Sequence, residues 1–257
     1  MRGANGAPFP GFAGALWLVL ASMVLELLCA ALLQRVPGLG DAERAALARL
    51  VANGALFTGL VAFTKLHYRA LFHDAPSSVG ATLGLTLLPV LALVPGLVVV
   101  ENWVGQWLTA LVPLSAWEAR AFSEMARPEL PVLVMLCALA PVLEEMLFRG
   151  VILRAFLQRY PRGIAIVHSA GIFGLAHMNL YQFVAAFTIG LLAGWLYERT
   201  RSLWPCIALH AAYNGSIALL ESGAADKAPD SVPLAALATA LLAAWFLKRW
   251  LQPARAG

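Results

Sequence analysis

The chain has 257 residues, of which 61% are hydrophobic and only 12% charged, with a mean hydropathy of +0.76 and a formal charge of +4. Soluble domains carry about 25% charged residues, so this composition indicates a membrane protein. The basic residues form no dense cluster, which gives nucleic-acid binding little support. The 3 cysteines lie in apolar runs without CxxC spacing and predict neither a disulfide framework nor a zinc site.

Eight apolar runs follow one another along the chain, each close to the roughly 20 residues that a transmembrane helix requires. We expect spans at 11–33, 45–66, 79–100, 130–153, 163–180, 182–198, 202–220 and 232–251. Residues 101–129 contain Pro113 and several charges, and they predict an interfacial loop that includes an amphipathic helix. The sequence therefore predicts an all-α membrane bundle of about eight transmembrane helices, forming one domain over residues 1–257.

The distribution of lysine and arginine predicts the orientation of this bundle. With eight spans, eleven of these residues lie on the side of both termini and six on the other side. The positive-inside rule then places both termini in the cytoplasm. The alanine-rich and arginine-rich composition is typical of a bacterial protein, so we expect the bacterial cytoplasmic membrane. Two GxxxG pairs, Gly80 with Gly84 and Gly190 with Gly194, predict close helix packing.

Several polar side chains lie inside the predicted spans. An ionisable group at membrane depth costs roughly 2.5–3.5 kcal/mol on insertion scales and marks a functional site by default. The fourth, fifth and seventh spans carry such groups, together with one amide: Glu144, Glu145, Arg149, His177, His210 and Asn214. Counted from the cytoplasmic ends of their helices, Glu144, His177 and His210 lie about 12–21 Å deep. The sequence therefore predicts one shared site within the membrane.

The spacing of these residues assigns them different roles. Glu145 and Arg149 are four residues apart, share a helix face and are expected to form a structural ion pair. Glu144 is rotated by about 100° from Glu145, so we expect it to remain an unpaired carboxylate. His210 and Asn214 are also four apart and project from one face as neighbouring donors.

Such a set supports hydrolysis. A carboxylate and a histidine can together orient and deprotonate a water, while two donors stabilise the oxyanion formed from an attacked amide. No serine or cysteine lies in a nucleophile motif beside these groups, so a covalent intermediate is not favoured. Elsewhere in the spans, Glu26 stands alone and His168 does not share the face of His177. We interpret both as structural residues.

Two alternatives stay open from the residues themselves. Glu144, His177 and His210 have the chemistry of zinc ligands, although the chain has no HExxH motif. A zinc-dependent membrane metalloprotease is therefore one rival. The other is a transporter, or a non-catalytic membrane scaffold or immunity protein. The internal repeats typical of transporters are not evident.

Three short segments also carry a family resemblance: "EEMLFR" (144–149), "FGLAH" (173–177) and "HAAYN" (210–214). In order and spacing they resemble the EExxxR, FxxxH and HxxxN motifs of the CPBP or Abi family. These are intramembrane glutamic endopeptidases related to the eukaryotic CAAX prenyl endopeptidases. The resemblance covers roughly residues 130–220, which we take as the catalytic core, and it implies an eight-helix membrane fold.

The resemblance also implies the site. Glu144 with His177 would activate water, His210 with Asn214 would form the oxyanion hole, and Glu145 with Arg149 would support them, without a metal or other cofactor. The implied partners are the lipid bilayer and a membrane-associated protein or peptide substrate. In a bacterium a prenylated substrate is doubtful, and a leader peptide or a C-terminal sorting tail fits better. The oligomeric state is left open.

Overall fold

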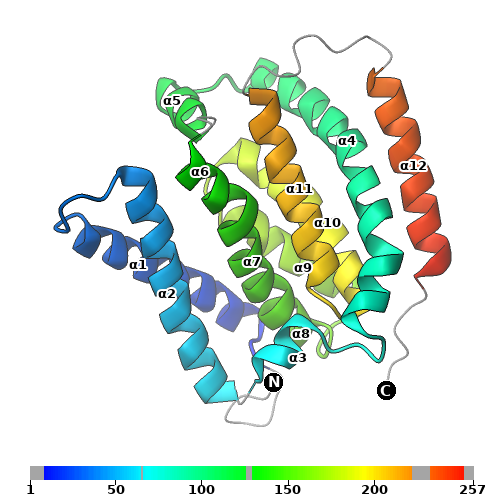
Figure 1. Ribbon diagram of the computed structural model, residues 1–257, viewed down its shortest axis with the longest axis horizontal. Coiled ribbons are helices and arrows are strands. Elements are labelled where there is room, and N and C mark those ends of the chain that lie inside the picture. The colour runs from blue at the N-terminus through cyan, green and yellow to red at the C-terminus, as the bar shows by residue number, and fades with distance from the viewer. Residues whose placement is uncertain (1–8, 65, 126–128, 222–231, 252–257) are drawn as a thin grey trace.

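The computed structural model describes residues 9–64, 66–125, 129–221 and 232–251 (Figure 1). The helices of the first half are α1 (Phe12–Leu33), α2 (Asp41–Thr64), α3 (Tyr68–Phe72), α4 (Val79–Leu111) and α5 (Ala116–Met125). A segmented helix follows: α6 (Leu130–Val134), η1 (Met135–Leu139), α7 (Ala140–Glu145), η2 (Met146–Leu153) and α8 (Arg154–Phe156). The last four helices are α9 (Arg162–Leu175), α10 (Leu180–Thr200), α11 (Trp204–Glu221) and α12 (Val232–Trp250).

The predicted all-α membrane bundle is confirmed. Each of the eight predicted runs is helical, and in the described residues five helices are long and apolar enough to cross a membrane: Phe12–Leu33, Asp41–Thr64, Val79–Leu111, Leu130–Phe156 and Leu180–Thr200. The expected number was about eight. The 14-residue α9 falls short by its length. In α11, polar residues such as His210 and Asn214 lower the hydropathy of the helix.

The helices form three groups (Figure 1). α1 and α2 pack together as a hairpin on one side, while α4 packs against α12 and α11 on the opposite side. Between these groups lie the segmented helix 130–156 and the paired helices α9 and α10. Residues 145–153 are all buried, so the centre of the molecule is the very segment that holds the "EEMLFR" motif.

Pro141 bears on the first irregular turn of the segmented helix. The turn just before this proline, η1, is a π-helix, in which the N–H of Ala140 donates to the carbonyl of Met135. The next π-helical donor, to the carbonyl of Leu136, would be the N–H of residue 141, but proline has none. π-helical turns are rare and occur frequently at functional sites, and α7, which carries Glu144 and Glu145, lies between two such segments.

Two boundary predictions are corrected. The third span was expected to end at residue 100, followed by an interfacial loop, but α4 continues to Leu111. The polar residues after position 100 do not interrupt helical hydrogen bonding, and the helix ends just before Pro113, where the residue preceding a proline disfavours helical geometry. The amphipathic helix expected in this region is α5. The fifth span ends at Leu175 rather than 180, because Asn179 caps the start of α10.

The two GxxxG predictions had different outcomes. A Cβ at Gly190 would lie 2.8 Å from the Cβ of Ala170, and one at Gly194 would lie 3.0 Å from Ile166. These glycines therefore allow the close approach of α10 to α9, as predicted. At Gly84 a Cβ would meet nothing within 4 Å, so the prediction of close packing through the first pair is wrong.

Candidate active site

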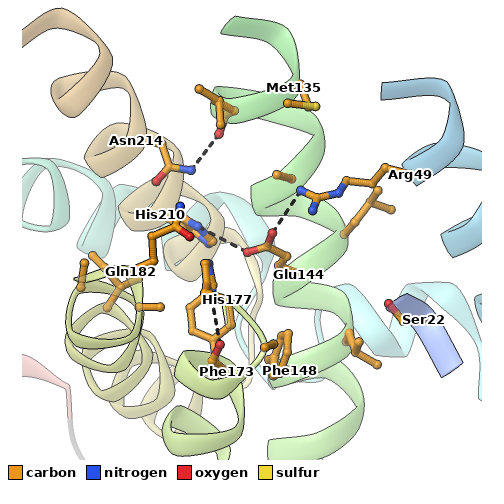
Figure 2. A pocket seen from close by; sticks show the side chains of 18 of the residues that line it. Ser22, Arg49, Met135, Glu144, Phe148, Phe173, His177, Gln182, His210 and Asn214 are labelled. Atoms are coloured by element: carbon orange, nitrogen blue, oxygen red, sulfur yellow. Dashed lines mark hydrogen bonds and ion pairs between the residues drawn. The ribbon is translucent and has the colours of Figure 1, made fainter. Parts of the chain in front are cut away.

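Polar residues from all three motifs line one cavity of about 610 Å³ between the α1–α2 hairpin and the central helices (Figure 2). Four of the expected site residues line it: Glu144, His177, His210 and Asn214. Two further charged residues, Glu26 and Arg49, line it from the hairpin. Glu145 and Arg149 lie behind this wall, almost fully buried. The structure therefore brings four of the six predicted site residues to one cavity.

Glu145 and Arg149 form the predicted ion pair. The Nη1 of Arg149 donates to the Oε1 of Glu145 at 2.9 Å, and both side chains are at most 1% exposed. The guanidinium of Arg149 also lies over the ring of Phe173, 4.7 Å from its centroid, which adds a cation–π contact. The same Glu145 Oε1 lies 2.9 Å from the Nδ1 of His210. Glu145 therefore joins the structural arginine to a histidine of the cavity wall.

Glu144 has partners, and the expectation that it stays unpaired is wrong. Its Oε1 lies 3.3 Å from the Nη1 of Arg49, and its Oε2 lies 3.7 Å from the Nε2 of His210 (Figure 2). The rotation away from Arg149 is as predicted, but α2 brings a different arginine to the same carboxylate. That contact joins residues 95 positions apart, which helix geometry within one span cannot reveal.

The contacts of His210 determine what each ring nitrogen can do. An ionised carboxylate only accepts hydrogen bonds, so the Nδ1 that faces Glu145 carries a proton. In the neutral ring the Nε2 would then accept, and only in the imidazolium form does Nε2 donate. The oxyanion role expected for His210 would therefore require the imidazolium form of this ring, whose two nitrogens face the carboxylates of Glu144 and Glu145.

His177 lies just beyond the end of α9, where the chain turns toward α10. Its Nδ1 faces the carbonyl oxygen of Phe173 at 2.9 Å. Because a carbonyl oxygen only accepts, Nδ1 carries the proton and the Nε2 of the neutral ring is an acceptor. Met178 follows with a left-handed φ of 53°, a conformation uncommon outside glycine and asparagine. Asn179 then accepts hydrogen bonds from the N–H groups of Tyr181 and Gln182 and starts the next helix.

Asn214 is held in place by the irregular turn at Pro141. Its Nδ2 donates to the carbonyl of Leu136 at 2.8 Å. In the π-helical turn the backbone donor to this carbonyl would be the N–H of residue 141, which proline lacks. The side chain of Asn214 therefore takes the place of a missing backbone N–H. A carboxamide has two N–H groups, so Asn214, which lines the cavity, has a second donor that a bound group could use. The same proline thus shapes the helix of Glu144 and anchors Asn214.

Helix α5 is tied to the loop that carries His177. Ser115 and Glu118 form a capping box, with the Oγ and N–H of Ser115 donating to Glu118 at 2.6 and 2.9 Å. The Nδ2 of Asn179 donates to the other carboxylate oxygen of Glu118 at 2.7 Å. These hydrogen bonds, those from Ser115 first, hold the pKa of Glu118 below its ordinary value. Phe122 of α5 lines the cavity.

The remaining predictions concern two residues set aside as structural. His168 packs among the rings of Phe12, Phe156 and Tyr160, away from the cavity, in keeping with a structural role. Glu26 does not stand alone, since it pairs with Arg49 at 3.1 Å and lines the cavity.

In the described part of the chain, no group of three or more His, Cys, Asp or Glu residues is arranged to hold a metal ion.

The principal residue that sequence reasoning missed is Arg49. Its position inside the predicted span 45–66 was a usable signal, because a cation at membrane depth needs a partner. It was instead counted among the charges of a loop. The carbonyl of Leu136 is the second omission. Only the combination of Pro141 with π-helical geometry identifies it.

Comparisons with known proteins agree with the motifs. The model of the family described as type II CAAX prenyl endopeptidase Rce1-like matches residues 126–216, a stretch that contains all three motifs. "Putative membrane peptidase YdiL" of Bacillus subtilis (strain 168) is 27% identical over 92 residues. That match covers 35% of this chain and 38% of the relative, so the chain spans well under half of the curated relative. No solved structure matches. The resemblance to CAAX-type membrane proteases is confirmed over this segment.

Proposed function

We propose that the protein is an intramembrane glutamic endopeptidase that hydrolyses a peptide bond of a membrane-associated protein or peptide. The observation that carries the proposal is the convergence of Glu144, His177 and His210 on one cavity from three separate elements (Figure 2). The match to the CAAX prenyl endopeptidase family supports the same reaction type.

In the proposed reaction, a water lies between the carboxylate of Glu144 and the Nε2 of neutral His177. Glu144 accepts a proton from this water as the water oxygen bonds to the carbonyl carbon of the scissile amide. The carbonyl oxygen becomes an oxyanion, which accepts hydrogen bonds from the second N–H of Asn214 and from the Nε2–H of the His210 imidazolium. Glu144 then delivers its proton to the amide nitrogen, the C–N bond breaks and an amine leaves.

The charge of the site favours this assignment. Three carboxylates, those of Glu26, Glu144 and Glu145, face two guanidinium groups, those of Arg49 and Arg149. The difference is one negative charge, which an imidazolium at His210 balances. A balanced cluster is the arrangement that a low-dielectric interior requires. The oxyanion role of His210, which needs its charged form, is thus consistent with its neighbours.

The bilayer and the cavity support a membrane-associated substrate. The chain is an integral membrane protein, so the peptide that reaches this cavity is held at or in the membrane. We place the protein in a bacterial cytoplasmic membrane with both termini in the cytoplasm. A leader peptide or a C-terminal sorting tail is the proposed substrate class. Residues 1–8 and 252–257, on which the orientation also depends, lie outside the described residues.

The decisive experiment uses Glu144→Gln. The amide is nearly isosteric but cannot accept the proton of water, so this variant should remain folded and capture its substrate from solubilised membranes. Mass spectrometry identifies the co-purified peptide, and a quenched fluorescent substrate is made from its sequence. Wild-type protein should cleave this substrate, and Glu144→Gln should cleave it about 10²–10⁴-fold more slowly.

The same preparation separates this proposal from the zinc alternative. Under the proposed mechanism, turnover survives extensive chelation. Stoichiometric zinc that is lost in His210→Ala, with turnover lost on chelation, would establish the metalloprotease instead. Near-normal turnover of Glu144→Gln would refute the assignment of the base. A chain that cleaves no captured peptide at all would favour a non-catalytic membrane protein or a transporter.

A further inference from the structure

Arg49 joins the α1–α2 hairpin to the proposed base. Its Nε donates to the Oε1 of Glu26 on α1 at 3.1 Å, and its Nη1 donates to the Oε1 of Glu144 on α7 at 3.3 Å. One guanidinium therefore bridges two carboxylates from different helices. Both the arginine and Glu26 lie outside residues 126–216, the segment that matches the family.

We propose that Arg49 is a positioning residue of the active site, and that Glu26 in turn holds Arg49. The proposal rests on the role of Glu144 as the base. With its Oε1 on Arg49, the carboxylate presents its Oε2 to His210 and the cavity (Figure 2). A carboxylate that lacks this partner is free to turn about its terminal torsion, which has only a broad preference. Arg49 thereby fixes which oxygen of Glu144 meets the water.

The fork of the guanidinium explains why this position holds arginine. Its Nε and Nη1 donate in different directions at the same time, so Glu26 and Glu144 are both satisfied in one geometry. The single ammonium of a lysine is a compact charge without this fork. A lysine at position 49 would supply the charge but would not hold both carboxylates in their present orientations.

The ion pairs of Arg49 lie at the cavity wall and not in the packed core. The side chains of Arg49, Glu26 and Glu144 are 28%, 31% and 21% exposed and line the cavity, so leaving one of them unpaired costs less than leaving a fully buried charge unpaired. The side chains of Glu145 and Arg149, by contrast, are at most 1% exposed, so that pair belongs to the packed core. The Arg49 bridge therefore acts on the orientation of Glu144 more than on folding.

The test compares Arg49→Met, Arg49→Lys and a matched control on the same helix. Arg44→Met is the control, because Arg44 pairs with Asp41 at the start of α2 and does not line the cavity. With the quenched peptide identified through Glu144→Gln, Arg49→Met should lower kcat by up to about 10²-fold, the cost of misplacing a reacting group by about 1 Å. KM and the melting temperature should change little. Arg49→Lys should recover part of kcat, and Arg44→Met should match wild type.

A double variant separates positioning from simple neutralisation. If Arg49 served only to neutralise Glu26, removing both in Glu26→Gln/Arg49→Met would restore kcat. Under the proposal the double variant stays as slow as Arg49→Met. Restored turnover, or wild-type kcat in Arg49→Met, would overturn the inference. If Arg49→Met does not fold, Arg49→Lys and the double variant decide the question by the same comparison of kcat.

The turnover of Glu144→Gln and Arg49→Met together distinguishes a wrong role for Arg49 from a wrong role for Glu144. An inactive Glu144→Gln with a fully active Arg49→Met removes only the role of Arg49. An active Glu144→Gln removes the base and, with it, the reason for positioning that residue.

Discussion

Removing the carboxylate of Glu145 should be strongly destabilising. In Glu145→Ala the guanidinium of Arg149, 1% exposed and 2.9 Å from its only ion-pair partner among the described residues, is left charged inside the bundle. Breaking a buried pair by removing one partner costs about 3–5 kcal/mol. At about 2–4 °C per kcal/mol for a chain of this size, the melting temperature should fall by about 6–20 °C. Thermal unfolding in detergent measures this change.

The same variant should also impair turnover, because Glu145 holds the Nδ1 of His210 at 2.9 Å. A second substitution separates the two effects. In Glu145→Ala/Arg149→Met both charges are gone, and replacing a buried pair by apolar groups is often nearly neutral. More than half of the lost melting temperature should return, while kcat stays low because His210 still lacks its partner.

The melting temperatures of Glu144→Ala and Glu145→Ala test these two roles against each other. Glu144 is 21% exposed, so Glu144→Ala should abolish turnover with only a small change in melting temperature. If Glu145→Ala melts like wild type while Glu144→Ala is strongly destabilised, the two roles have been assigned in reverse. If the double variant melts as low as Glu145→Ala, the cost does not come from the unpaired arginine.

Three further predictions concern the oxyanion side and the packing of α10 against α9. Asn214→Ala should lower kcat by about 10²–10³-fold with little change in KM. Pro141→Ala, which supplies an N–H that competes for the carbonyl of Leu136, should lower kcat by less, and a kcat below that of Asn214→Ala would contradict the proposed link. Gly190→Ala should destabilise the fold by about 1–3 kcal/mol in detergent melting because its Cβ would meet Ala170 at 2.8 Å. Gly84→Ala, with nothing within 4 Å, is the control, and equal melting of the two variants would show that α9 and α10 do not depend on this contact.

Local patterns in the sequence were sufficient for much of this protein. Hydropathy placed all eight helical runs, since a membrane span is defined by its own side chains and satisfies its own backbone hydrogen bonds. The pair of Glu145 and Arg149 followed from a spacing of four residues, which puts two side chains on one helix face. The shared depth of Glu144, His177 and His210 predicted a common site, and the structure brings all three to one cavity.

The tertiary structure decided what depends on contacts between distant segments. Arg49 reaches Glu144 only because α2 packs beside the segmented helix, and a contact across 95 positions leaves no periodic signal in the sequence. Two carboxylates on another helix supply the partners of His210. The carbonyl of Leu136, in the turn before Pro141, supplies the partner of Asn214. Which helices pack closely was likewise settled in three dimensions: identical GxxxG spacing brings α9 against Gly190 and nothing against Gly84, because a small residue permits close approach but does not supply the neighbour.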